Sequence, residues 1–141
     1  MVIPFFSAPR NPKSDLYTYH FQDQKGYSKR VHLRIEEDSS GILFVDVTDA
    51  IHLNRTASLI AYWALEGVTE KKALNRLKAA YSGHDQISRD VSGVYKLVRH
   101  VTTESGCPSC GVDFLERKAL FSTRAKSPYK ADIALKRKSV V

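Results

Sequence analysis

Alternating apolar and polar residues predict strands in the first half of the chain. In VHLRIEE, apolar Val31, Leu33 and Ile35 alternate with polar residues, which is the two-residue period of a half-buried strand. Residues from Asp38 to Gly41 have turn composition, GILFVDV resumes as a second strand, and IHLN follows a tight connection as a third. We therefore expect three short antiparallel strands joined as a meander.

Helical spacing of apolar residues follows the strands. Asn54 is expected to cap a helix over RTASLIAYWALEG, which ends at Gly67. Thr69 is expected to cap a second helix, EKKALNRLKAAY, and Asp85 a third helix over residues 86–101. Three strands followed by three helices predict an α+β, winged-helix-like domain over residues 31–102. The apolar face of the third helix consists of Ile87, Val91, Val94, Val98 and Val101.

The two flanks of this domain are less regular. Residues 1–30 contain three of the five prolines, and we expect a largely irregular arm with extended pieces around LYTYHF. Residues 103–141 form a basic tail that contains the motif GCPSCG. No apolar run approaches the ~20 residues that span a bilayer, and the N-terminus lacks the features of a signal peptide. We therefore expect a cytoplasmic protein.

The net charge of +7 lies almost entirely in the tail. Residues 1–116 contain 14 basic and 14 acidic residues, whereas residues 117–141 contain eight basic residues and one acid, Asp132. A DNA-binding domain carries its basic surface on the folded part, so nucleic acid is not the expected partner. A DNA-binding winged helix remains the alternative, because the second helix carries Lys71, Lys72, Arg76 and Lys78.

Candidate chemistry is sparse. Cys107 and Cys110 form a CxxC, which suits a redox pair or half of a zinc site. The surroundings lack the strand and helix of a thioredoxin-like unit, and no second CxxC supplies further metal ligands. We interpret the motif as a turn, and keep a metal or redox protein as a further alternative. The five histidines show no metal-ligand spacing, and no phosphate-binding glycine loop is present. The expectation is a protein that is not an enzyme and needs no cofactor.

The predicted meander suggests peptide binding rather than DNA binding or metal chemistry. Such a sheet has an edge strand with unpaired backbone groups. Tyr95 and Leu97 extend the third helix's apolar face beyond one stripe. An edge strand beside an apolar helix is the arrangement to which an extended peptide can add as a further strand.

The stretch FVDVTDAIHLNRTASLIAYWALEGVTEKKALNRLKAAY, residues 44–81, resembles the PqqD-like family of peptide chaperones, which are recognition elements for ribosomally made precursor peptides. The resemblance includes Leu53-Asn54 after the hairpin, Ala57, Ile60, and Gly67 with Thr69. It implies non-catalytic capture of a precursor's leader segment for a radical SAM modifying enzyme. By this resemblance, the leader would bind Ala50, Ile51, His52 and Leu53 of the third strand and Val91, Val94, Tyr95 and Val98 of the third helix. We expect an exposed Tyr95 as the aromatic anchor.

The tail carries a second resemblance. SPYKADIAL, residues 127–135, is similar to the opening strand of a radical SAM barrel. In fused enzymes of that kind a CxxxCxxC motif follows, whereas this chain has no cysteine after Cys110. We therefore expect either the N-terminal portion of such an enzyme or a shortened stand-alone relative with a vestigial segment, and SAM chemistry by this chain is not expected.

Overall fold

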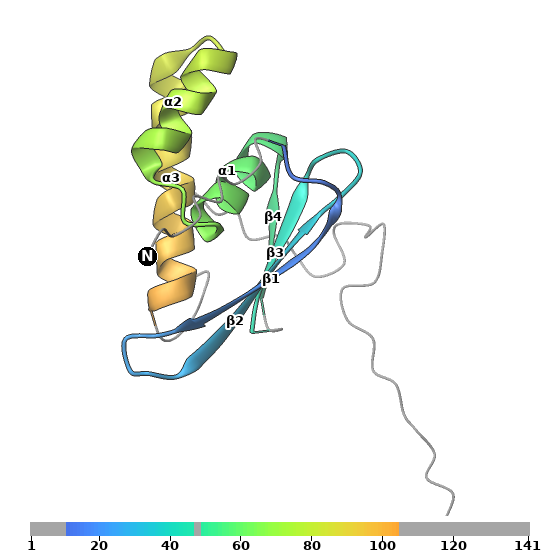
Figure 1. The fold of residues 1–141 in the computed structure, drawn as a ribbon, viewed down its shortest axis with the longest axis vertical. Helices are drawn as coiled ribbons and strands as arrows, with labels where there is room; N and C mark the ends of the chain where they lie inside the picture. The colour runs from blue at the N-terminus through green and yellow to red at the C-terminus, as the bar shows by residue number, and fades with distance from the viewer. Residues whose placement is uncertain (1–10, 47–48, 105–141) are drawn as a thin grey trace, which may run out of the picture.

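In the part of the chain that the structure describes, a four-stranded antiparallel sheet is combined with three helices (Figure 1). The computed structural model describes residues 11–46 and 49–104. The sheet order β1-β2-β3-β4 follows the chain, so each strand pairs with its sequence neighbour. The elements are β1 Asp15–Gln22, β2 Ser28–Ile35, β3 Gly41–Val45, β4 Asp49–Leu53, α1 Arg55–Leu65, α2 Glu70–Ala80 and α3 His84–Thr103.

The prediction of an α+β fold is confirmed, but the prediction of three strands is wrong. The additional strand, β1, occupies the LYTYHF stretch, where extended pieces were expected within the otherwise irregular arm of residues 1–30. It pairs with β2 over its whole length, from Asp15 opposite Ile35 to Gln22 opposite Ser28. Its sequence signal is weak because its inward residues are Tyr17, Tyr19 and Phe21, which are only partly buried. The hydroxyl groups of the two tyrosines blur the contrast between apolar and polar positions.

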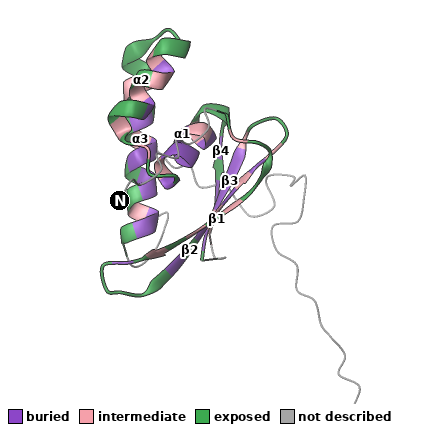
Figure 2. Ribbon diagram, in the orientation of Figure 1, coloured by how far each residue is buried: buried purple, intermediate pink, exposed green. Residues whose placement is uncertain are grey.

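The three helices lie on one face of the sheet, with α1 and α3 against the strands and α2 packed on α3 and α1. Figure 1 shows α1 between the sheet and the antiparallel pair of α2 and α3. Figure 2 shows buried residues where α1 meets its neighbours and exposed residues at the far end of the α2–α3 pair. The side chains of α1 that fill the centre include Ile60 and Trp63, which are 0% and 2% exposed. The hydrophobic core therefore lies around α1, between the sheet and α3.

Local signals determine the ends of the first two helices. The Asn54 side chain accepts a hydrogen bond from the Ala57 N–H at 2.8 Å, and Thr69 caps α2 in the same way. At the other end of α1, Gly67 has a φ of +81°. The Gly67 N–H donates to the Ala64 carbonyl and the Val68 N–H to the Trp63 carbonyl, which is the Schellman pattern. The predicted caps at Asn54 and Thr69 and the stop at Gly67 are confirmed.

The predicted cap of α3 at Asp85 is wrong. The helix begins at His84 after Gly83, whose φ is +89° and whose missing side chain supplies no capping hydrogen bond. Asp85 instead lies in the first turn, where its carboxylate stabilises the positive end of the helix dipole. At its other end α3 continues to Thr103.

The hairpin between β1 and β2 holds the C-terminal end of α3. Lys29 is 6% exposed, and its ammonium donates to the carbonyls of Val101, at 3.2 Å, and Glu104. The Gln24 N–H donates to the Thr103 carbonyl at 3.0 Å. The last carbonyls of a helix have no partner within the helix, and a cation there also complements the helix dipole. These contacts fix α3 across the sheet.

Candidate functional site

The candidate site combines β4 with the face of α3 that points toward it. We call residues 50–53 of β4 together with Val91, Val94, Tyr95 and Val98 of α3 the β4–α3 site. β4 is the last strand in the sheet order, and its described pairing is with β3 alone. The predicted edge strand therefore lies where the sequence placed it.

β4 presents two different faces. Ile51 and Leu53 are 6% and 7% exposed and belong to the hydrophobic core, whereas Ala50 and His52 are exposed. Successive side chains of a strand point to opposite sides of a sheet. An additional strand beside β4 would continue both faces, with one set of side chains next to Ile51 and Leu53 and the other set next to His52.

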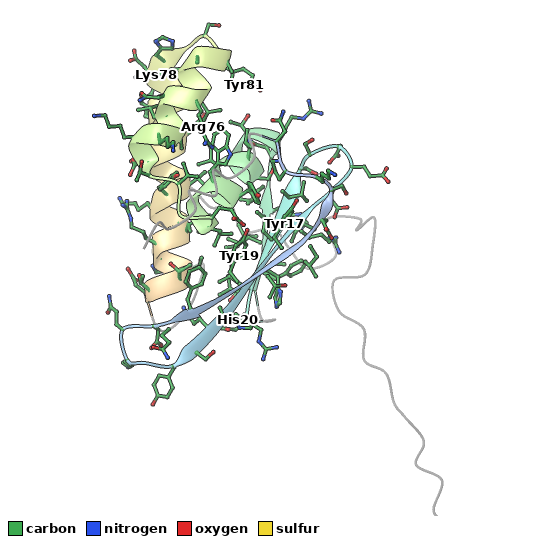
Figure 3. All side chains as sticks on the ribbon, viewed as in Figure 1. Tyr17, Tyr19, His20, Arg76, Lys78 and Tyr81 are labelled. Carbon is green, nitrogen blue, oxygen red and sulfur yellow. The ribbon has the colours of Figure 1, made fainter. Side chains whose placement is uncertain are left out.

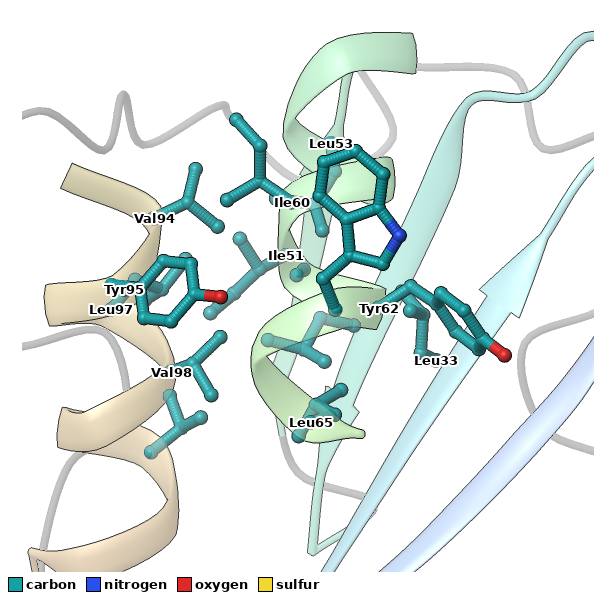
Figure 4. Close-up of a cluster of buried hydrophobic side chains, with 14 of the residues drawn as sticks. Leu33, Ile51, Leu53, Ile60, Tyr62, Leu65, Val94, Tyr95, Leu97 and Val98 are labelled. Carbon is teal, nitrogen blue, oxygen red and sulfur yellow. The ribbon is translucent and has the colours of Figure 1, made fainter. Parts of the chain in front are cut away.

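The α3 residues divide into those near β4 and those used elsewhere. Figure 4 shows Val94 and Val98 pointing from α3 toward the part of the core that contains Ile51 and Ile60. Both valines are 6% exposed and belong to the same cluster as Ile51. Val91 is 1% exposed and is a core residue. Val94, Val98 and Ile51 are therefore members of the single hydrophobic core that the helices share with the sheet.

Tyr95 is buried, so the expectation of an exposed aromatic anchor is wrong. Its side chain is 8% exposed, and its hydroxyl donates a hydrogen bond to the Val68 carbonyl at 2.6 Å. Val68 lies in the connection between α1 and α2. Tyr95 therefore fastens α3 to that connection, and its truncation would disturb the fold itself.

Burial raises the pKa of the Tyr95 phenol to about 12, with the negative charge of Glu70 adding to the effect. An unfolded tyrosine ionises near pH 10, so neutral Tyr95 stabilises the fold below pH 10 and this contribution is lost between pH 10 and 12. We predict that Tyr95→Phe lowers the free energy of unfolding by about 1 kcal/mol at neutral pH, because the hydrogen bond to the Val68 carbonyl is lost. The variant should also lose less stability than the wild type as the pH rises.

Urea unfolding of wild type and Tyr95→Phe at about pH 8 and about pH 12 measures both effects. The Tyr95→Phe variant should still lose some stability between these pH values, because burial also raises the pKa of Tyr19. The Tyr19 hydroxyl donates to Glu66 at 2.6 Å in the folded protein. Equal losses in the two proteins across this pH range would contradict the assignment of Tyr95 as a buried neutral phenol.

A basic outer face of the sheet was missed in the sequence. The strand residues that alternate with the core residues point away from the helices, and five of them are His20, Arg30, His32, Arg34 and His52. Not one of these outward positions in β1 to β4 carries Asp or Glu. The signal is present in VHLRI, where the polar residues of the alternation are His32 and Arg34, but a strand period alone does not show which strands share a face.

Contacts on this outer face orient the basic groups. The Arg34 guanidinium lies 5.7 Å from the centre of the Phe44 ring, and its Nε lies 2.7 Å from a Glu36 carboxylate oxygen. The Thr18 hydroxyl and the His32 Nδ1 are 2.9 Å apart. Because Phe44 belongs to β3, its contact with Arg34 places that cation one strand nearer to β4 than its own strand β2.

The alternative DNA-binding surface on α2 is partly occupied by structural contacts. The Arg76 guanidinium lies 5.3 Å from the centre of the Trp63 ring, and Glu70 forms an ion pair with Arg99 at 3.8 Å. Figure 3 shows Arg76 and Lys78 on the α2–α3 pair, whereas Tyr17, Tyr19 and His20 lie on β1. Lys71 and Lys72 are exposed in the first turns of α2.

The predicted metal and redox residues, Cys107 and Cys110, lie outside the described residues. Within residues 11–46 and 49–104, no three side chains of metal-ligating type gather at one place. None of the described helices combines the length and apolar composition needed to cross a bilayer.

Comparisons of this chain with families of known proteins, with curated proteins and with solved structures gave no match.

Proposed function

We propose that this protein binds an extended peptide as a fifth strand beside β4, and that it presents the peptide without catalysing a reaction itself. One observation carries the proposal: β4 is the edge strand of the sheet, and its inward residues share an apolar cluster with α3. A peptide added at such an edge gains backbone hydrogen bonds from the strand and side-chain contacts from the helix.

The other edge of the sheet is less suited to this role. β1 is also an edge strand, but its inward residues contact the end of α1. The Tyr17 ring packs edge-on against Tyr62 at 5.0 Å, and Tyr19 donates a hydrogen bond to Glu66. The hairpin that contains β1 is also attached to the end of α3 through Gln24 and Lys29. These contacts support β4 as the binding edge.

The resemblance of residues 44–81 to the PqqD-like family supports a more specific form of the proposal. In this form the domain is a winged helix, and the peptide is the leader segment of a ribosomally made precursor. The partner is a radical SAM enzyme in the cytoplasm that modifies the rest of the precursor. Capture of the leader then raises the effective concentration of the precursor at the modifying enzyme.

The test is a titration of fluorescently labelled short peptides encoded next to the gene in its genome. We expect binding with a micromolar or tighter dissociation constant. The affinity should depend on every second backbone N–H group of the peptide. Successive N–H groups of a strand point to opposite edges, so N-methylation of one alternate set of amides should abolish binding and methylation of the other set should be tolerated. Equal effects of the two sets would exclude strand addition.

Proline substitutions on the two edge strands provide a matched pair. His52→Pro in β4 should weaken peptide binding by at least about tenfold, because proline removes an N–H and disturbs the strand. Thr18→Pro in β1, also at an exposed edge position, should leave the affinity nearly unchanged. Circular dichroism melting verifies that both variants are folded. Equal losses in the two variants would contradict binding at β4.

The same titration with duplex DNA distinguishes the alternative. A DNA-binding winged helix would bind the duplex, and its affinity would fall steeply as the salt concentration rises. Peptide capture by an apolar cluster and a strand edge would depend much less on salt. Salt-sensitive duplex binding without any peptide binding would replace the proposed function by DNA binding.

A further inference from the structure

The two faces of β4 constrain the sequence of a strand added beside it. The inward residues Ile51 and Leu53 lie in the apolar cluster, and the outward residue His52 is exposed on the outer face of the sheet. A strand in register with β4 points every second side chain to each face. Its inward side chains would lie next to Ile51, Leu53 and the α3 valines, so apolar residues fit there.

The outward positions of that strand would meet a face on which the basic side chains belong to the strands and the nearest carboxylate, Glu36, is paired with Arg34 at 2.7 Å. The outward residues of β1 to β4 include two arginines and three histidines and no carboxylate. His52 would be the direct cross-strand neighbour, at a separation where its imidazole can pair with an acidic side chain. Arg34, held over Phe44 of β3, adds a cation at longer range. Its neighbour Glu36 lies beyond the end of β2.

We propose that the peptide captured beside β4 alternates apolar residues with aspartate or glutamate, the acidic residues facing the outer surface next to His52. This inference rests on the proposed strand addition and extends it to the class of peptide selected. A neutral polar residue at the outward positions would lose the attraction. A lysine or arginine there would lie on the same face as Arg30 and Arg34 of β2.

Three synthetic ten-residue peptides test the proposal directly. They share the same leucine and valine residues at alternate positions and carry only glutamate, only glutamine or only lysine at the positions between. Fluorescence anisotropy with the full chain should give the tightest binding for the glutamate peptide. Each step, to glutamine and then to lysine, should weaken binding roughly threefold, as expected for solvent-exposed charge pairs. The differences should shrink at high salt.

A matched pair of variants locates the effect. His52→Glu in β4 should reverse the order of the three peptides, whereas His20→Glu should leave the order unchanged. His20 is a suitable control because it is also an exposed histidine on the outer face but lies on β1, at the far edge (Figure 3). The basic residues of segment 117–141 are the same in all proteins compared, so their effect on binding does not differ between the variants.

The outcomes separate this inference from the function on which it rests. Equal affinities of the wild type for all three peptides would overturn the charge preference and leave strand addition standing. Equal changes in His52→Glu and His20→Glu would also overturn it, because the attraction would then belong to the protein's overall field. No binding of any of the three peptides at millimolar concentration would contradict strand addition itself.

Discussion

Trp63→Ala is expected to lower the free energy of unfolding by about 4 kcal/mol, in the range of large aromatic residues removed from a core. Trp63 is 2% exposed at the centre of the cluster between α1, the sheet and α3. Its ring also lies beneath the Arg76 guanidinium of α2. Alanine would therefore leave a cavity in the core and remove the apolar surface on which Arg76 rests.

Urea denaturation followed by far-ultraviolet circular dichroism measures this loss, since Trp63 is the single tryptophan and its fluorescence disappears with it. Tyr27→Ala is the control: Tyr27 is a large aromatic residue that is 69% exposed, and its loss should change stability by less than about 0.5 kcal/mol. A loss below about 1 kcal/mol in Trp63→Ala would contradict the placement of Trp63 in the core.

Gly41→Ala is expected to destabilise the protein by about 2 kcal/mol through a steric clash. A Cβ atom at Gly41, the first residue of β3, would lie 2.7 Å from the Cβ of Ser58 in α1. Ser58 has little freedom to move, because it is 1% exposed and its hydroxyl donates to the Ser39 carbonyl at 2.6 Å. The helix and the strand would therefore have to separate.

A double-mutant cycle with Ser58→Gly identifies the clash as the cause. Ser58→Gly alone destabilises, because it removes a buried hydrogen bond and places glycine in a helix. It also removes the Cβ atom that the methyl group introduced by Gly41→Ala would meet, so the double variant should lose less stability than the sum of the two single losses. Additive losses in chemical denaturation would show that Gly41 and Ser58 are not in contact.

The charge preference of the proposed peptide site depends on the register of the sheet. His52 lies opposite Ile42, Ile42 lies opposite Arg34, and Arg34 lies opposite Leu16. A shift of the β3–β4 pairing by one residue would exchange the faces of Ile51 and His52. The core therefore maintains the outer face, because burial of Ile51 and Leu53 excludes the shifted register.

Much of the fold could be predicted from the sequence where the signal is local. The strand period of VHLRIEE, the caps Asn54 and Thr69, and the stop at Gly67 all act through neighbouring residues. Each of these hydrogen bonds or φ values involves residues within a few positions of one another. The three helices and the strands β2 to β4 were therefore predicted close to their observed positions, and the apolar face of α3 was recognised as well.

Contacts between distant residues decided the rest. β1 joins the sheet because it pairs with β2 and packs on α1, whereas its own pattern predicted extended pieces around LYTYHF but no sheet partner. Tyr95 and Val94 are adjacent on α3, but the Tyr95 hydroxyl donates to the Val68 carbonyl whereas Val94 points toward the part of the core that contains Ile60 and Ile51. The helical period of the sequence does not distinguish the two residues, because both belong to the apolar side of the helix. Only the packing of α1 and α2 against α3 determines their different roles.

The sequence by itself determined which residues form β2 to β4 and the three helices and which of their faces are apolar, because capping and side-chain period are local properties. The tertiary structure decided that β1 pairs with β2, that Tyr95 is enclosed, and that five arginine and histidine side chains share one surface. These features depend on the order of strands in the sheet and on the helix packing. Both arise from burying apolar surfaces that lie far apart in the chain.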